Sequence, residues 1–194
     1  MVRAAGGARS PAAGADTALE ERLRLVAGAV PDPELPVLTL TELGVLRAVR
    51  LLGPGRVEVD LTPTYTGCPA VEAMAADIER ALHAHGVPEV TVRSVLAPAW
   101  STDDITDEGR RKLAAFGIAP PRTGPAAGPV TVPLGPTRTT SAHPRTDPTD
   151  LAPVACPRCG STDTELLSRF SSTACKALRR CRACAEPFDH FKEL

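Results

Sequence analysis

Two CxxC pairs near the carboxyl end constrain the fold of this chain more than any other feature. Cys156 and Cys159 form the first pair, Cys181 and Cys184 form the second, and 21 residues separate them. Each pair places two thiolates at the tip of a tight turn, and two such turns facing each other provide the tetrahedron of sulfurs that zinc prefers. The few apolar residues between the pairs form too thin a core to fold alone, so we expect metal binding to contribute much of the folding free energy.

The pattern therefore predicts a zinc ribbon over residues 151–194. A single iron ion in the same cage would look identical in the sequence. Four protein ligands complete the coordination, so the predicted site is structural rather than catalytic. The clustered cysteines and the absence of a signal peptide favour a cytoplasmic protein with reduced thiols, and no apolar run is long enough to span a membrane.

A proline-rich stretch divides the chain. Residues 119–150 contain eight prolines and show no hydrophobic periodicity, which is typical of a semi-extended linker. The first fifteen residues are mostly Ala, Gly, Pro and Arg, a composition typical of disorder. We therefore expect a disordered tail, a first domain, a linker and a ribbon, over residues 1–16, 17–121, 122–150 and 151–194.

The sequence pattern of the first domain predicts an α+β fold. Thr17 and Glu20 have capping-box spacing before a helix, and a Thr-Glu-Leu-Gly run over 41–44 indicates a turn. Apolar and polar residues alternate in the strand predicted over 56–62, as on a sheet with one wet face. The predicted order is helix, strand, strand, helix, strand, helix, which fits a two-layer α/β sandwich with helices on one face of a small sheet.

Cys68 is the candidate functional residue of this domain. Pro69 follows it and favours the first helical position, so we expect Cys68 to be the N-cap of the helix predicted over 68–85. There, unpaired backbone N–H groups and the helix dipole would stabilise a thiolate that binds metal or attacks as a nucleophile. The alternative is a small buried residue that happens to begin a helix.

A thiol enzyme would need a base near Cys68. The histidines of this domain, His83 and His85, lie some fifteen residues away at the far end of the same helix, at a distance of over ~20 Å. This disfavours a Cys–His pair. A metal or cluster site needs more ligands than one thiolate, and Asp32 and Glu34 of the Pro-Asp-Pro-Glu-Leu-Pro loop could add oxygens. A homodimer would add a second Cys68.

Cys175 and the basic residues near the second CxxC pair each have two interpretations. Cys175 lies outside the CxxC pairs, and it is either a buried ribbon residue or an extra exposed thiol that shares a transferred metal or contacts a partner. Basic residues gather near the second pair, but no aromatic side chains are interleaved with them for bases to stack on. The first domain is acidic, since residues 17–118 carry 10 Lys+Arg against 15 Asp+Glu. Nucleic acid is therefore a disfavoured partner.

Several segments resemble known families. The runs DPELP, TELGVL and VDLTPTYTGCPA resemble the SufT-like iron–sulfur cluster assembly family over roughly residues 17–121, with Asp32, Pro33, Glu34, Cys68 and Pro69 at its hallmark positions. The run from Cys156 to the end, with TACKALRRC and EPFDHFK, resembles the D-subunit family of the phenylacetyl-CoA epoxidase system, with Ser171 standing where that family has glycine.

The resemblance implies an accessory role in aerobic phenylacetate degradation. It implies that the chain does not itself oxidise phenylacetyl-CoA, but helps to mature the iron–sulfur or di-iron centres of the oxygenase and reductase subunits. Cys68 would then be the transient iron or cluster ligand, assisted by Asp32 or Glu34, and the ribbon zinc would be structural. A non-catalytic subunit that stabilises the oxygenase complex is the alternative.

Overall fold

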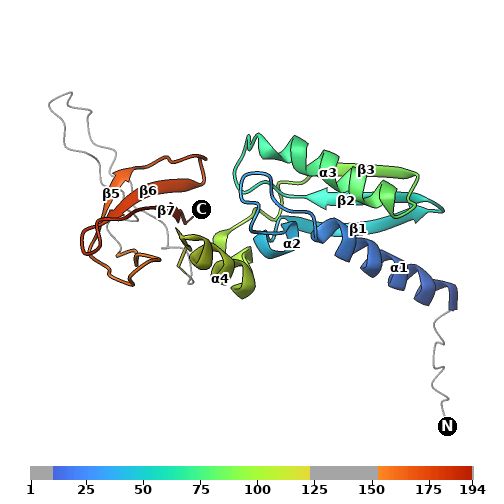
Figure 1. Ribbon diagram of the computed structural model, residues 1–194. Helices are drawn as coiled ribbons and strands as arrows, with labels where there is room; N and C mark the ends of the chain where they lie inside the picture. Colours follow the sequence, from blue (N-terminus) through green and yellow to red (C-terminus); the bar gives the residue numbers. More distant parts are fainter. Residues whose placement is uncertain (1–10, 123–152, 194) are drawn as a thin grey trace, which may run out of the picture. The chain divides into compact units, whose positions relative to one another are not determined.

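A computed structural model describes residues 11–122 and 153–193, which form two compact units divided between Trp100 and Ser101 (Figure 1). The first unit is α+β, as predicted. Its elements are α1 (Pro11–Gly28), α2 (Leu40–Leu43), β1 (Leu46–Gly53), β2 (Arg56–Leu61), α3 (Ala70–Ala84) and β3 (Glu89–Ser94).

A three-stranded sheet in the order β1-β2-β3 forms one layer of this unit, and α1 and α3 form the other (Figure 1). Strands β1 and β2 are an antiparallel hairpin, whereas β3 runs parallel to β2 after the crossover through α3. The alternation predicted for the second strand is confirmed on one face, where Val57 and Val59 are buried. The other face is wet only in part, because Asp60 and Thr62 are buried as well. The apolar stripe of α3 is buried as well, and it comprises Met74, Ile78 and Leu82.

The other face of this sheet carries a network of ion pairs. Arg50 contacts Asp60 at 2.6 Å and Glu58 at 3.2 Å, while Arg93 contacts the same two carboxylates at 2.9 Å and 3.1 Å. The register explains the network, since Arg50 lies opposite Glu58 and Asp60 lies opposite Arg93 on neighbouring strands. The Arg50 and Arg93 guanidiniums hold the pKa of Asp60 below its usual range despite its burial.

The amino-terminal helix differs from the prediction. It begins at Pro11 rather than at Thr17, so part of the expected tail over 1–16 is helical. Glu20 does not take part in a capping box with Thr17. Instead its carboxylate accepts a hydrogen bond from the Leu51 backbone N–H at 2.8 Å, which satisfies a donor on the open edge of β1.

The capping box lies elsewhere, at the segment predicted to be a turn. Thr39 and Glu42 bond reciprocally to each other's backbone N–H groups and begin the short helix α2. Gly44 ends it with φ of 77°, a left-handed conformation that glycine adopts without strain. The same Thr-x-x-Glu spacing thus occurs twice in this part of the sequence, and tertiary context decides which copy acts as a cap.

The second unit contains a 3-10 helix (Thr102–Asp104) and α4 (Asp107–Phe116), followed by a four-stranded sheet in the order β4-β7-β6-β5. Its strands are β4 (Ile118–Ala119), β5 (Thr164–Ser168), β6 (Lys176–Cys181) and β7 (Pro187–Phe191). Thr106 caps α4, since its hydroxyl accepts a hydrogen bond from Gly109 N–H at 3.0 Å.

The placement of α4 differs from the predicted boundary at residue 121. Strand β4 pairs with β7, with Ile118 opposite Asp189 and Ala119 opposite His190, so α4 and β4 group with the ribbon rather than with the first domain. Residues 1–10 of the predicted tail and 123–150 of the predicted linker lie outside the described residues. Among the helices that the structure describes, none is long and apolar enough to cross a membrane.

Removing the Asp60 carboxylate should destabilise the first unit. We expect Asp60→Asn to lower the free energy of unfolding by ~1 kcal/mol at neutral pH, because both arginine partners are about half exposed. The folded-state pKa of Asp60 lies below its ordinary value of 3.8, so this contribution is present above that pH and is lost as the pH falls through the lowered value.

Denaturant unfolding of both proteins between pH 2 and 7 measures this difference. The matched control is Asp77→Asn, which removes an exposed i,i+3 pair with Arg80 on α3 and should change stability by less than ~0.5 kcal/mol. A difference between wild type and Asp60→Asn that persists below the lowered pKa would contradict the assignment.

Candidate functional site

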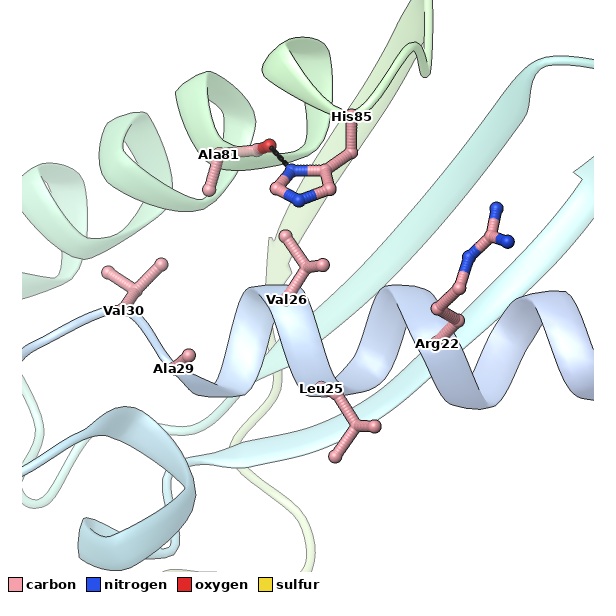
Figure 2. Close-up of a pocket in the computed structure, with 7 residues that line it drawn as sticks. All are labelled: Arg22, Leu25, Val26, Ala29, Val30, Ala81 and His85. Carbon is pink, nitrogen blue, oxygen red and sulfur yellow. Dashed lines mark hydrogen bonds between the residues drawn. The ribbon is translucent and has the colours of Figure 1, made fainter.

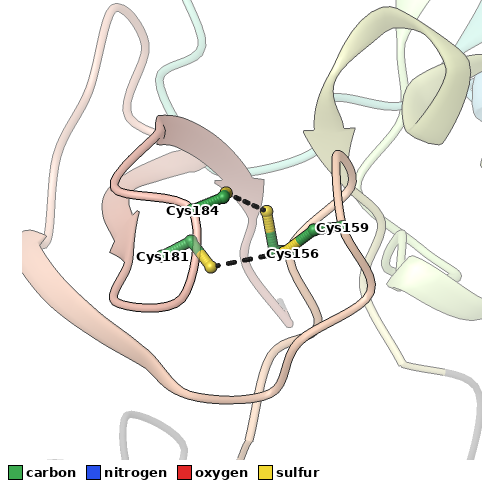
Figure 3. Close-up of side chains that lie close together, drawn as sticks. All are labelled: Cys156, Cys159, Cys181 and Cys184. Carbon is green, nitrogen blue, oxygen red and sulfur yellow. Dashed lines mark hydrogen bonds between the residues drawn. The ribbon is translucent and has the colours of Figure 1, made fainter.

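Four thiols converge in the second unit at the place the CxxC spacing predicts. The sulfurs of Cys156 and Cys184 lie 3.8 Å apart, those of Cys159 and Cys181 lie 3.6 Å apart, and all four lie within 4.8 Å of one another (Figure 3). A zinc ion with Zn–S bonds of about 2.3 Å at the centre of a tetrahedron separates its sulfurs by ~3.8 Å. The donor set and its spacing therefore fit zinc.

Two tight turns hold these thiols. In the first, Gly160 N–H donates to the Cys156 carbonyl at 2.9 Å, and Gly160 adopts φ of 74°, a left-handed conformation that glycine adopts without strain. In the second, Cys181 N–H donates to the Glu186 carbonyl at 2.9 Å, and Ala185 adopts φ of 63°. Both turns position their sulfurs through backbone bonds.

The clustered thiols interact strongly. The Cys184 backbone N–H, together with bonds from the neighbouring thiols, lowers the pKa of Cys181 to about 7 despite burial. The Glu186 N–H lowers the pKa of Cys184, but burial and the thiols around it raise that pKa to about 12. One thiol thus loses its proton readily, and its negative charge makes loss of the proton from the neighbouring thiol unfavourable. A divalent cation removes this penalty, because it displaces the protons and neutralises the thiolates.

The basic residues of the ribbon are engaged within the unit. Arg180 and Arg182 pair with Glu165, and their hydrogen bonds hold the pKa of that carboxyl below its usual range. Lys176 is buried and lies 3.4 Å from Asp189. These internal pairings favour the interpretation that the positive charge stabilises the fold rather than binding nucleic acid.

Cys175 lies apart from the metal cluster. It is buried, its sulfur lies 3.1 Å from the Thr173 hydroxyl, and its carbonyl accepts a hydrogen bond from Lys192 N–H at 3.0 Å. The position fits a buried ribbon residue better than an exposed extra thiol.

Cys68 lies in the first unit, half-buried, at the end of the loop that joins β2 to α3. Its N–H donates to the Tyr65 carbonyl at 3.3 Å, closing a turn in which Gly67 adopts φ of 85°. Helix α3 begins at Ala70 with Pro69 as its N-cap, so Cys68 lies one residue before the cap rather than at the cap as predicted.

The electrostatics of Cys68 contradict the prediction of a stabilised thiolate. Burial raises the pKa of the thiol, and the carboxylates of Glu34 and Asp32 raise it further. The Ala70 backbone N–H and the Tyr65 hydroxyl favour the thiolate, as a helix N-terminus should, but they are outweighed. A helix N-terminus is visible in the local sequence, whereas the burial of the thiol depends on the tertiary fold, so the helix alone did not predict the direction of the pKa shift.

Asp32 organises the loop that carries these carboxylates. It is 4% exposed, and its Oδ1 accepts hydrogen bonds from Glu34 N–H at 2.9 Å and Leu35 N–H at 2.7 Å. Its own N–H donates to the Leu38 carbonyl at 2.9 Å. One Asp32 oxygen is thus committed to the loop, whereas Glu34 is half-buried and its charge acts on Cys68.

Cys68, Asp32 and Glu34 do not form a ready chelate. Across residues 11–122 and 153–193, the four ribbon cysteines are the only group of three or more Cys, His, Asp or Glu side chains whose ligand atoms are close enough to hold an ion. The two histidines add no ligand here, because they lie at the far end of α3, where His83 Nδ1 bonds to the Val87 carbonyl and His85 Nδ1 to the Ala81 carbonyl.

A groove between α1 and α3 is a further cavity of the first unit (Figure 2). It has a volume of about 530 Å³, and its lining is mostly apolar, with Arg22 and His85 as its titratable residues. This lining offers no cluster of nucleophilic or metal-binding groups, so we place the candidate chemistry at Cys68 and at the four ribbon thiols.

Known proteins match both units. Residues 20–97 match the family model of iron-sulfur cluster assembly proteins, and residues 135–192 match that of the PaaD zinc beta ribbon domain. A protein of Escherichia coli (strain K12), named as a putative D subunit of 1,2-phenylacetyl-CoA epoxidase, is 45% identical over 163 residues, which cover 84% of this chain and 86% of that protein. This chain belongs to the family of phenylacetyl-CoA epoxidase D subunits.

The first domain of this D-subunit family member has a further relative. A protein of Porphyromonas gingivalis (strain ATCC BAA-308 / W83) named "Fe-S protein maturation auxiliary factor" is 30% identical over 95 residues. The match covers 90% of that protein and 48% of this chain. The two halves of the chain thus have separate relationships, one to iron–sulfur assembly proteins and one to a zinc ribbon.

Removing one ribbon ligand should abolish metal binding. We expect Cys181→Ser to reduce zinc from about one ion per chain to less than about a tenth of that and to unfold the ribbon, because three thiolates leave the coordination open. Elemental analysis and thermal unfolding measure both effects. Cys175→Ser is the matched control. It removes a buried thiol outside the cluster and should keep its zinc.

The carboxylates should slow the reaction of Cys68. Neutralising Glu34 with Glu34→Gln should lower the pKa of Cys68 and speed its alkylation at about pH 8 by about two- to tenfold, because only the thiolate reacts. Tyr65→Phe should slow the same reaction. Mass spectrometry of the Cys68 peptide follows it in zinc-loaded protein, with Glu21→Gln as the control. Equal rates for wild type and Glu34→Gln would refute the electrostatic assignment.

Proposed function

We propose that this chain is an accessory subunit of the phenylacetyl-CoA epoxidase system. In this proposal it carries iron, as an ion or an iron–sulfur cluster, to the metal centres of the oxygenase and reductase subunits, with Cys68 as the carrier ligand. The relationship to a D subunit over most of both chains supports the place in the epoxidase system. The match of residues 20–97 to iron–sulfur assembly proteins supports the role of carrier.

The arrangement of one thiol beside two carboxylates carries the proposal. With the pKa of Cys68 raised, the empty site holds a proton on the sulfur at neutral pH, so Cys68 is a poor nucleophile and is protected from oxidation. An iron cation replaces that proton. The negative charges of Glu34 and Asp32, which oppose a bare thiolate, then stabilise the cation bound to it.

The incomplete ligand set suits a carrier. A resident metal needs about four ligands, as in the ribbon, whereas Cys68 has one sulfur and the half-buried Glu34 carboxylate near it. The remaining ligands of the cargo would be sulfide, water or side chains of the receiving protein. A weakly held cargo can be passed on, and exchange of ligands between the two proteins requires no oxidant or reductant.

The metal content of anaerobically purified protein tests the proposal. We expect wild type to hold zinc at about one ion per chain together with substoichiometric iron and sulfide, and Cys68→Ser to keep its zinc but lose the iron and sulfide. Cys175→Ser is the matched control, because it removes another cysteine outside the ribbon cluster and should keep both metals.

The same measurement can favour the alternative function, a non-catalytic subunit that stabilises the oxygenase complex. If both proteins carry zinc alone, and reconstitution with iron and sulfide gives no difference between them, the carrier role fails. Stable co-purification of Cys68→Ser with the oxygenase subunits at wild-type yield and activity would then identify a non-catalytic subunit that stabilises the complex.

A further inference from the structure

We propose that the free edge of β3 is a self-complementary surface through which two copies of this chain pair into one continuous sheet. The partner is a second copy of the first unit, related by a two-fold axis at Thr91. The surface comprises the strand β3 from Glu89 to Arg93, which has one neighbour, β2, in the part of the chain that the structure describes.

The backbone of β3 presents unpaired groups at this edge. The N–H groups of Glu89 and Val95 donate to carbonyls of Gly55 and Leu61, at 3.1 Å and 2.8 Å. Because a strand alternates its hydrogen-bonding direction, the odd-numbered residues face β2, and the N–H and C=O groups of Val90 and Val92 point away from it. These are the groups that a second strand would bond.

The opposite edge of the same sheet, on β1, has outward backbone groups bonded to side chains of α1. On β1, Glu20 accepts the outward N–H of Leu51 at 2.8 Å, and Arg24 reaches the outward carbonyl of Arg47 at 3.5 Å. Side chains of α1 thus block the β1 edge against pairing, whereas no such bond to the outward groups of Val90 and Val92 occurs within the described residues. The fold covers one edge and leaves the other available.

The sequence of β3 is complementary to itself when reversed. With Thr91 on the two-fold axis, Val90 lies opposite Val92 of the second copy, and Glu89 lies opposite Arg93 of the second copy. Each Val90–Val92 pair would exchange two backbone hydrogen bonds, making about four in all. Both valines are partly exposed in the single chain, whereas Val57 and Val59 on the neighbouring strand are buried, so pairing would cover apolar surface.

The charges select this register. Glu89 and Arg93 lie on the wet face of the sheet with Thr91, and the side chain of Arg93 is 49% exposed even though it pairs with Glu58 and Asp60. A two-fold axis moved to Val92 would place Thr91 opposite Arg93 and Glu89 opposite Val95, which gives no charge pair. The register at Thr91 adds the Glu89 carboxylate of each copy to the ion-pair network of the other.

Sedimentation equilibrium of the full, zinc-loaded, reduced chain over a range of concentrations tests the surface. We expect a reversible equilibrium between the 20.3 kDa chain and its dimer, weakened by salt. Glu89→Lys should raise the dimer dissociation constant by about tenfold or more, since two attractive pairs become repulsive. Glu21→Lys makes the same charge change on an exposed position of α1 and should leave the constant unchanged.

Amide hydrogen exchange of the wild type gives a test that requires no variant. The amides of Val90 and Val92 should become protected as the concentration rises, while those of Thr91 and Arg93, which face β2, stay protected throughout. A chain that remains monomeric at all concentrations would overturn the proposal. So would a dimer that is insensitive to Glu89→Lys and leaves Val90 and Val92 exchanging freely, because it would use another surface.

Discussion

The candidate carrier site depends on one buried carboxylate. Asp32 uses a single oxygen to hold the N–H groups of Glu34 and Leu35, and these bonds fix a loop whose three prolines cannot form a helix. The fixed loop presents the Glu34 and Asp32 carboxylates to Cys68, although more than thirty residues separate them along the chain. Without the Asp32 carboxylate the loop would lose these two bonds, which help to position the charge that acts on the thiol.

The two thiol sites of this chain differ in the number of their ligands and in the charge around them. In the ribbon, four sulfurs face one another within 4.8 Å and compete for protons, so the cluster is completed by a metal that displaces them and remains. At Cys68, one sulfur lies beside carboxylates that raise its pKa, so the empty site is stable as a protonated thiol. Closed coordination suits a permanent structural ion, and open coordination suits cargo that must leave.

Local patterns in the sequence predicted those features that local interactions determine. The CxxC spacing located the four ribbon thiols, and alternation located the buried valines of β2. The predicted direction of the Cys68 pKa shift was wrong, because a helix N-terminus is visible in the local sequence, whereas the burial of the thiol, the largest cause of the shift, depends on the tertiary fold. The pairing of β4 with β7 was missed because a two-residue strand carries no periodicity.

Transfer of labelled iron is the most direct test of the carrier role. Wild-type chain loaded anaerobically with ⁵⁷Fe and sulfide is mixed with the metal-free oxygenase or reductase subunit, and Mössbauer spectra follow the label in the receiving protein. We predict that wild type delivers label faster than free iron and sulfide do, and that Cys68→Ser gives no acceleration. Equal delivery by wild type and Cys68→Ser would contradict the proposal that this thiol carries the iron.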